Sequence, residues 1–128
     1  MADLSKEQCE KLKEWGMEQT HLDVVHCYDV NLDGPRWAIH TNGGKLDEWE
    51  IKIPTITELK EFALTVAQEM LSDCWLTIWF DEIDNYTIAI QITVPTRGVI
   101  TKHRSKAKTE SLALFNLIEK IVEARDED

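Results

Sequence analysis

The chain has 128 residues, a net charge of −10 and a composition that is 43% apolar and 30% charged. This balance excludes a disordered chain, and the lack of an apolar run of about 20 residues excludes a membrane-spanning helix. We therefore expect one domain over residues 1–128, and a cytoplasmic location because MADLSKEQ lacks the apolar centre of a signal peptide.

The N-terminal segment, residues 1–21, predicts a short helix and a connection. Ser5 and Gln8 have the spacing of a capping box, and Gly16 provides a left-handed stop, so the helix is expected over about Lys6 to Trp15. Residues 22–53 then carry three β-rich stretches, LDVVHCY, RWAIH and EWEIKI. TNGG between the second and third stretch has the Asn-Gly pair of tight hairpins, which predicts a β meander.

Residues 54–125 predict a helix, a hairpin and a last helix. Thr55 and Glu58 have capping-box spacing before an apolar stripe, and CWLTIWF and YTIAIQITV form the hairpin. After Pro95 a basic loop is expected to about Arg104. The stripe of the second helix is Leu59, Phe62, Ala63, Val66, Ala67 and Met70, and that of the last helix is Leu114, Phe115, Ile118, Ile121 and Val122.

These elements predict an α+β fold. Helices pack on a mostly antiparallel sheet in the order α-β-β-β-α-β-β-α.

The stretch DVNLDG resembles the start of a calcium-binding loop. Asp29, Asn31 and Asp33 stand at ligand positions, and Gly34 follows them. Position twelve is His40, where this loop needs a bidentate glutamate, and the preceding residues predict a strand in place of a helix. We therefore expect an ordinary turn, no bound metal and no cofactor.

No motif in the chain predicts catalysis. Cys9, Cys27 and Cys74 are widely spaced without a CxxC pair, so we expect reduced and mostly buried thiols. Phosphate-binding glycine loops and a strained nucleophile turn are absent, and the acids of DEIDN suit a solvated hairpin loop. The expectation is a non-enzymatic protein.

Positive charge is concentrated in one segment. Between Asn85 and Thr109 the chain has no acidic residue, and the remainder carries 9 bases against 24 acids, or −15. The bases of this segment are Arg97, Lys102, Arg104, Lys106 and Lys108. Together with Thr109 at the start of the last helix they form a candidate anion site; the alternative is that they only pair with acids of the same chain or of a neighbour.

Two tryptophans define a second candidate surface. Trp75 and Trp79 fall on one side of their strand, and the other side is also apolar. This pattern is typical of a central strand covered on both faces. The alternative is a tryptophan-lined binding surface or subunit contact.

Three stretches carry a resemblance: LSKEQCEKLKEWG, PTITEL and KTESLALFNLIEK. In these the chain resembles short uncharacterised proteins of bacteriophages and prophages, including those described as α-β-α sandwiches. The resemblance covers the first 16 residues and the chain from Pro54 onward. It implies an accessory role, with anti-defence proteins such as anti-CRISPR proteins as one class, in the cytosol of a host bacterium.

Three functions follow as hypotheses. The first is a phage-type protein that antagonises a host defence protein or nuclease by presenting its acidic surface to a basic channel. The second is a protein that sequesters a nucleotide signal, with the basic segment 97–108 on the phosphates and Trp75, Trp79 or Tyr86 on the base. The third is a homo-oligomeric structural or regulatory protein whose tryptophan-bearing strand is the interface.

Overall fold

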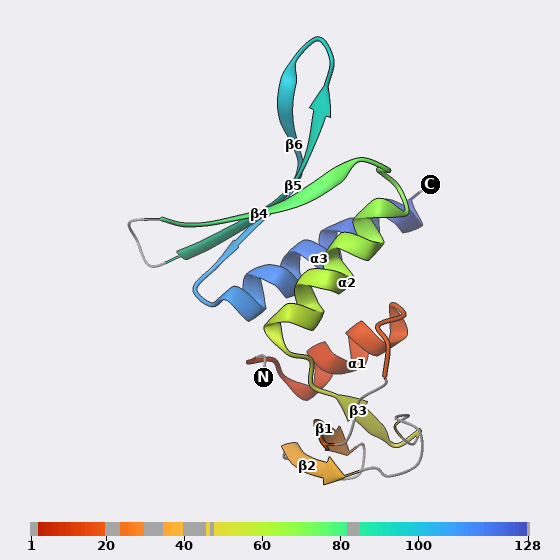
Figure 1. Ribbon diagram of the computed structural model, residues 1–128. Coiled ribbons are helices and arrows are strands. Elements are labelled where there is room, and N and C mark those ends of the chain that lie inside the picture. The colour runs from red at the N-terminus through yellow and green to blue at the C-terminus, as the bar shows by residue number, and fades with distance from the viewer. Residues whose placement is uncertain are drawn as a thin grey trace. The chain divides into compact units, whose positions relative to one another are not determined.

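The computed structural model describes residues 3–19, 24–29, 35–39, 46, 48–81 and 85–127. Within them the chain forms three helices and two three-stranded antiparallel sheets, which confirms the α+β class (Figure 1). The chain divides into two compact units, Met1–Thr55 and Ile56–Asp128. The expectation of a single domain stays a prediction, and each unit is described separately below.

The first unit begins with helix α1, Lys6–Glu14, followed by strands β1 (Val24–Asp29), β2 (Pro35–Ile39) and β3 (Glu50–Lys52). The predicted capping box is present, because the Ser5 hydroxyl accepts from the Gln8 backbone and the Gln8 side chain accepts from Ser5 N–H. Gly16 has φ +102°, the left-handed stop expected after this helix.

The predicted meander is wrong in its pairing. The sheet order is β2-β1-β3, so β3 pairs with β1 and not with its sequence neighbour β2. Contacts from distant residues hold β3 in place: the Gln19 side chain accepts from Lys52 N–H at 2.9 Å, and Lys13 Nζ donates to the carbonyls of Glu48 and Glu50. TNGG lies outside the described residues.

The second unit runs in the order α2 (Ile56–Gln68), β4 (Cys74–Asp81), β5 (Asn85–Val94), β6 (Gly98–Ala107) and α3 (Glu110–Asp126). The predicted basic loop is therefore wrong, because most of it is strand β6, paired with β5. The two strands meet in a tight turn in which Arg97 N–H donates to the Val94 carbonyl, and Gly98 follows with φ +75°. This is the geometry of a three-residue hairpin loop that closes with a left-handed residue.

Both helices cover the same face of the β4-β5-β6 sheet (Figure 1). Ile88 and Ile90 on this face are fully buried, as are Leu114, Ile118 and Ile121 of α3. The Ser105 hydroxyl, also on this face, donates to the Ala113 carbonyl and links β6 to α3. In the α2 stripe, Leu59, Ala63, Val66 and Ala67 are buried, whereas Met70 lies beyond the helix and is 37% exposed.

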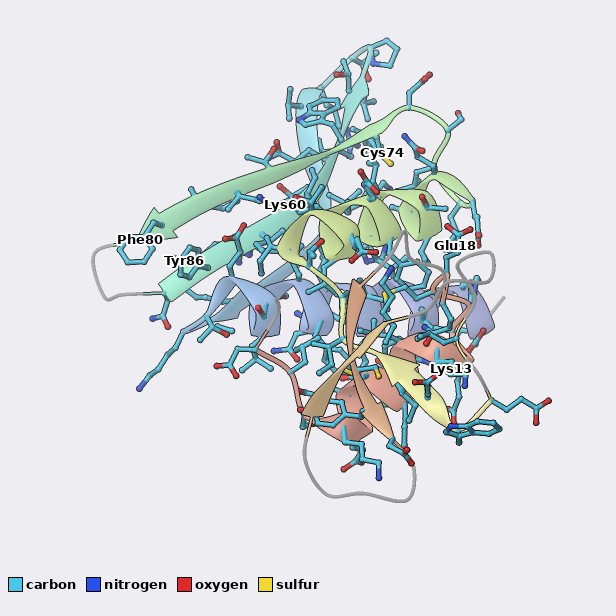
Figure 2. The ribbon with its side chains drawn as sticks, turned by 60° about the horizontal axis from the view of Figure 1, so that its bottom comes forward. Lys13, Glu18, Lys60, Cys74, Phe80 and Tyr86 are labelled. Carbon is cyan, nitrogen blue, oxygen red and sulfur yellow. The ribbon has the colours of Figure 1, made fainter. Side chains whose placement is uncertain are left out.

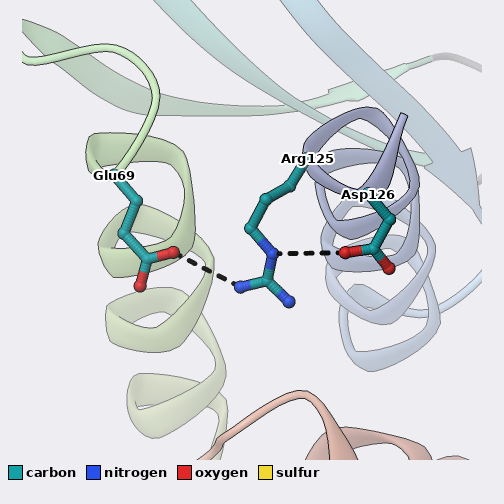
Figure 3. Close-up of polar contacts among 3 residues, drawn as sticks. All are labelled: Glu69, Arg125 and Asp126. Carbon is teal, nitrogen blue, oxygen red and sulfur yellow. Dashed lines mark hydrogen bonds and ion pairs between the residues drawn. The ribbon is translucent and has the colours of Figure 1, made fainter. Parts of the chain in front are cut away.

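A surface ion pair joins the ends of α2 and α3. Arg125 Nη1 lies 3.3 Å from Glu69 Oε2, and Arg125 Nε lies 3.7 Å from Asp126 Oδ1 (Figure 3). Both acids are more than half exposed, so each pair contributes at most about 1 kcal/mol. Apolar burial, not this contact, stabilises the packing of the two helices.

The start of α3 depends on a side-chain cap, which gives a first prediction. Thr109 is the N-cap residue, and its hydroxyl accepts from Leu112 N–H at 3.1 Å. Thr109→Ala is expected to lower the free energy of unfolding by about 0.5–2 kcal/mol, because a helix N–H loses its acceptor. Thr109→Ser keeps the acceptor and serves as the control in urea denaturation; equal losses in both variants would contradict this role of the hydroxyl.

No helix in the described part of the chain is long and apolar enough to cross a membrane.

Candidate functional site

On the face of the β4-β5-β6 sheet opposite α2 and α3, an aromatic, a small and a cationic side chain form a row across the three strands. Strand pairing places Trp79 opposite Thr87, and Thr87 opposite Lys106. In the next row Ala89 lies opposite Arg104. Because paired residues of an antiparallel sheet point to the same side, the tryptophan and the two cations flank a floor of small side chains.

The exposed fractions of these side chains are consistent with a shallow depression over Thr87 and Ala89 between larger side chains. Thr87 is 4% exposed and Ala89 fully buried, although α2 and α3 both cover the opposite face, whereas Trp79 is 38% exposed. Arg104 and Lys106 are also exposed. The larger side chains therefore rise on both sides of the floor.

A hollow of about 350 Å³ lies at this place. Its lining residues are Trp79, Thr87, Arg104, Ser105, Lys106 and Lys120. The volume falls within the range of small-molecule sites, about 300–1,000 Å³. We call this feature the Trp79 hollow.

Lys120 reaches the Trp79 hollow from helix α3. Its ammonium donates to the Arg104 carbonyl at 2.6 Å, which places a third cation beside β6. The lining residues that the structure describes are therefore one tryptophan, three cations and two hydroxyl residues, of which Thr87 lies on the open face and Ser105 on the helix-covered face. Such a lining favours an anion that also carries a flat apolar ring.

The structure brings only part of the predicted anion site together. Arg104 and Lys106 line the Trp79 hollow, but the remaining members of the predicted set do not. Arg97 lies in the β5–β6 turn, about 20 Å along the strand from Arg104. Lys102 is the unpaired residue of an irregularity in β6, Lys108 follows the strand, and the Thr109 hydroxyl caps α3.

The three aromatic residues predicted to contact a ligand do not lie together in the structure. Tyr86 lies on the helix-covered face and packs edge-on against Phe80, with ring centroids 5.0 Å apart (Figure 2). It cannot reach a ligand beside Trp79, because alternate residues of β5 point to opposite faces. Trp75 shares the open face with Trp79 but does not line the hollow.

The expectation of a central, doubly covered tryptophan strand is wrong. Strand β4 stands at the edge of the order β4-β5-β6, and Trp75 and Trp79 are 37% and 38% exposed. The reason is that both helices of this unit cover the same face.

The other candidate chemistry does not form a site in the described residues. Asn31 and Asp33 lie outside them, Asp29 ends β1 opposite Glu50, and no group of three or more histidines, cysteines or acids there could hold a metal ion. All three cysteines are buried, as predicted. Burial together with Glu10 raises the pKa of Cys9 to about 12, so this thiol stays protonated at neutral pH.

Sequence reasoning missed three features of this region: the floor of Thr87 and Ala89, the contribution of Lys120, and the strand character of β6. A signal for the last was present, because Pro95 and Gly98 are both residues that favour turns and they stand between two β-rich stretches.

No known protein family, no curated protein and no solved structure matches this chain.

His103, on the helix-covered side of β6, gives a prediction on pH. Burial, then Lys102 and Lys120, lower its pKa below the ordinary value of 6.5. The folded state therefore favours the neutral ring, whereas the unfolded chain binds a proton as the pH falls below 6.5. The stability of the chain should decline from pH 6.5 down to the lower folded pKa, and His103→Gln should remove that part of the decline in urea denaturation. Identical pH profiles would contradict this assignment.

Proposed function

We propose that the chain binds and sequesters a small anion that carries an aromatic ring, with a nucleotide as the chemical class. The observation that carries the proposal is the row Trp79, Thr87, Lys106 on the open face, with Arg104 in the next row. An indole ring can stack on any nucleobase, and adjacent cations bind phosphate oxygens. This combination corresponds to the second of the hypotheses drawn from the sequence, on a smaller set of residues.

The proposed role is binding without turnover. The lining offers stacking and charge. Among its described residues the hydroxyls belong to Thr87 and Ser105, and the Ser105 hydroxyl already donates to the Ala113 carbonyl. Nucleophilic catalysis would need a general base beside the hydroxyl, and the lining residues that the structure describes include no histidine and no carboxylate. Binding is thus the activity that these side chains support best.

The antagonist hypothesis has a different basis. It rests on the charge of −15 outside the basic segment and on the resemblance to phage proteins, and the acids are spread over both units. Residues 1–55 carry 6 bases and 11 acids, and residues 56–128 carry 8 bases and 13 acids, so each unit has a charge of −5. An interaction between the acidic surface and a host defence protein or nuclease stays a prediction.

The test uses three probes that separate the two halves of the ligand. In calorimetric titration, adenosine monophosphate should bind more tightly than adenosine, which lacks phosphate, and than ribose 5-phosphate, which lacks the base. Each missing part should cost about tenfold or more in affinity. Native mass spectrometry of protein purified gently at low salt should show a bound small anion.

Trp79→Ala should weaken adenosine monophosphate binding, whereas Trp49→Ala is the matched control. Trp49 is 49% exposed and is not among the lining residues of the Trp79 hollow, so this substitution removes a surface indole from a different part of the chain. A bare chain in the mass spectrum together with no heat from any of the three probes would refute the proposed function.

A further inference from the structure

The outer edge of β4 is available for pairing. All eight residues of β4, Cys74–Asp81, are paired with β5, and in the described part of the chain no strand pairs with the other edge. An edge strand presents a row of backbone N–H and C=O groups that another strand can complete.

Edges of this kind usually carry features that prevent pairing, such as lysine, proline or a bulge. Strand β4 has none of them between Cys74 and Phe80: this stretch contains no charge and no proline, and its register with β5 is continuous. The irregularity in this sheet lies between β5 and β6. The unprotected edge is therefore the one that bears the exposed tryptophans.

The stretch CWLTIWF is also symmetric in chemical character about Thr77. Trp75 and Trp79 are equidistant from it, Leu76 matches Ile78, and Cys74 matches Phe80. A two-fold interface requires a surface that is complementary to itself. We propose that two copies of the chain pair through β4 in antiparallel orientation, with the two-fold axis at Thr77, to form a continuous six-stranded sheet.

The register follows by elimination. In an antiparallel pair, two directly opposed residues point to the same face of the sheet, and successive residues of a strand point to opposite faces. The two-fold axis must therefore pass through a residue and not between two residues. The central candidates are Leu76, Thr77 and Ile78. An axis at Leu76 puts Trp79 opposite the partner's Asp73, and an axis at Ile78 puts Trp75 opposite the partner's Asp81. Only the axis at Thr77 places Trp75 opposite the partner's Trp79 and Leu76 opposite the partner's Ile78, and such apolar pairs stabilise a sheet.

This arrangement has two consequences. The partner's Trp75 lies beside Trp79 on the open face, so it extends the aromatic wall next to the hollow. Asp73 and the partner's Asp81 meet at both ends of the pair, and each chain carries −10, so added salt should strengthen the dimer. Salt should weaken binding of an anion at the hollow, which separates this inference from the proposed function.

The first test is sedimentation equilibrium over a range of concentrations. The wild type should approach twice the chain mass of 14.8 kDa. Thr77→Lys, which places two ammonium groups opposite each other at the axis, should raise the dissociation constant at least about tenfold. Thr93→Lys is the matched control, because Thr93 is exposed on the same face of the inner strand β5 and should leave the dimer intact.

Three more variants keep the result interpretable. The Thr77 hydroxyl donates to Gln91 Oε1 at 2.7 Å, and Thr77→Val removes this bond without adding charge, so it should remain dimeric. Thr77→Cys should form an interchain disulfide on mild oxidation, because directly opposed residues have Cα atoms about 4.5–5.5 Å apart. Thr93→Cys should not cross-link.

A wild type that stays monomeric at high concentration would overturn the proposal. So would a Thr77→Lys variant that dimerises as well as Thr93→Lys, or a Thr77→Cys variant that stays uncross-linked. The proposal would be supported if the Thr77→Lys variant is folded and monomeric while the Thr93→Lys variant is dimeric.

Discussion

Arg104→Glu combined with Lys106→Glu is expected to abolish binding of adenosine monophosphate to the Trp79 hollow, with a loss of at least about 100-fold. Each residue would contribute a charge-assisted hydrogen bond to phosphate of about 1.5 kcal/mol or more, and about 1.4 kcal/mol corresponds to tenfold in affinity. The reversed charges then add repulsion. Calorimetric titration at low salt measures the loss.

The matched control is Arg97→Glu combined with Lys102→Glu. It reverses the same number of charges in the same basic segment, but neither residue lines the Trp79 hollow. We expect a small loss of affinity, from the long-range field alone. If both pairs of substitutions weaken binding equally, the ligand responds to the general charge of the segment and the hollow is not its site.

Ile118→Ala is expected to lower the free energy of unfolding by about 2–5 kcal/mol. Ile118 is fully buried in α3, and truncation leaves a cavity that its neighbours fill only in part. Ile118→Val removes one methylene at the same place and should cost about 0.5–1.5 kcal/mol. Urea denaturation followed by circular dichroism measures both values, and a loss below that of Ile118→Val would contradict the assigned packing.

The same experiment bears on the domain prediction. Leu12 is fully buried in the other unit, so Leu12→Ala is the counterpart of Ile118→Ala. One domain over residues 1–128 predicts a single transition that both substitutions shift. Two transitions, each shifted by one substitution only, would show that the units unfold separately.

The candidate site could be predicted from sequence only in part. Residue type alone points to Arg104, Lys106 and Trp79, since cations bind phosphate and indole rings stack on bases. Their meeting depends on the pairing of Trp79 with Thr87 and of Thr87 with Lys106, two contacts between strands that no local pattern specifies. Arg97 and Tyr86 have the same chemistry as the lining residues, but the hairpin turn and the strand alternation place them elsewhere.

The helices of this protein follow from short stretches of its sequence. The Ser5 capping box, the Gly16 stop and the apolar stripes of α2 and α3 are set by residues within a few positions of each other, so helix positions follow directly. Three features become visible only in the folded chain: β3 pairs with β1, the basic segment is strand β6, and β4 is an exposed edge. The physical reason is that strand order and register are specified by contacts between distant residues, such as Gln19 with Lys52, whereas helix ends and periodicity are specified locally.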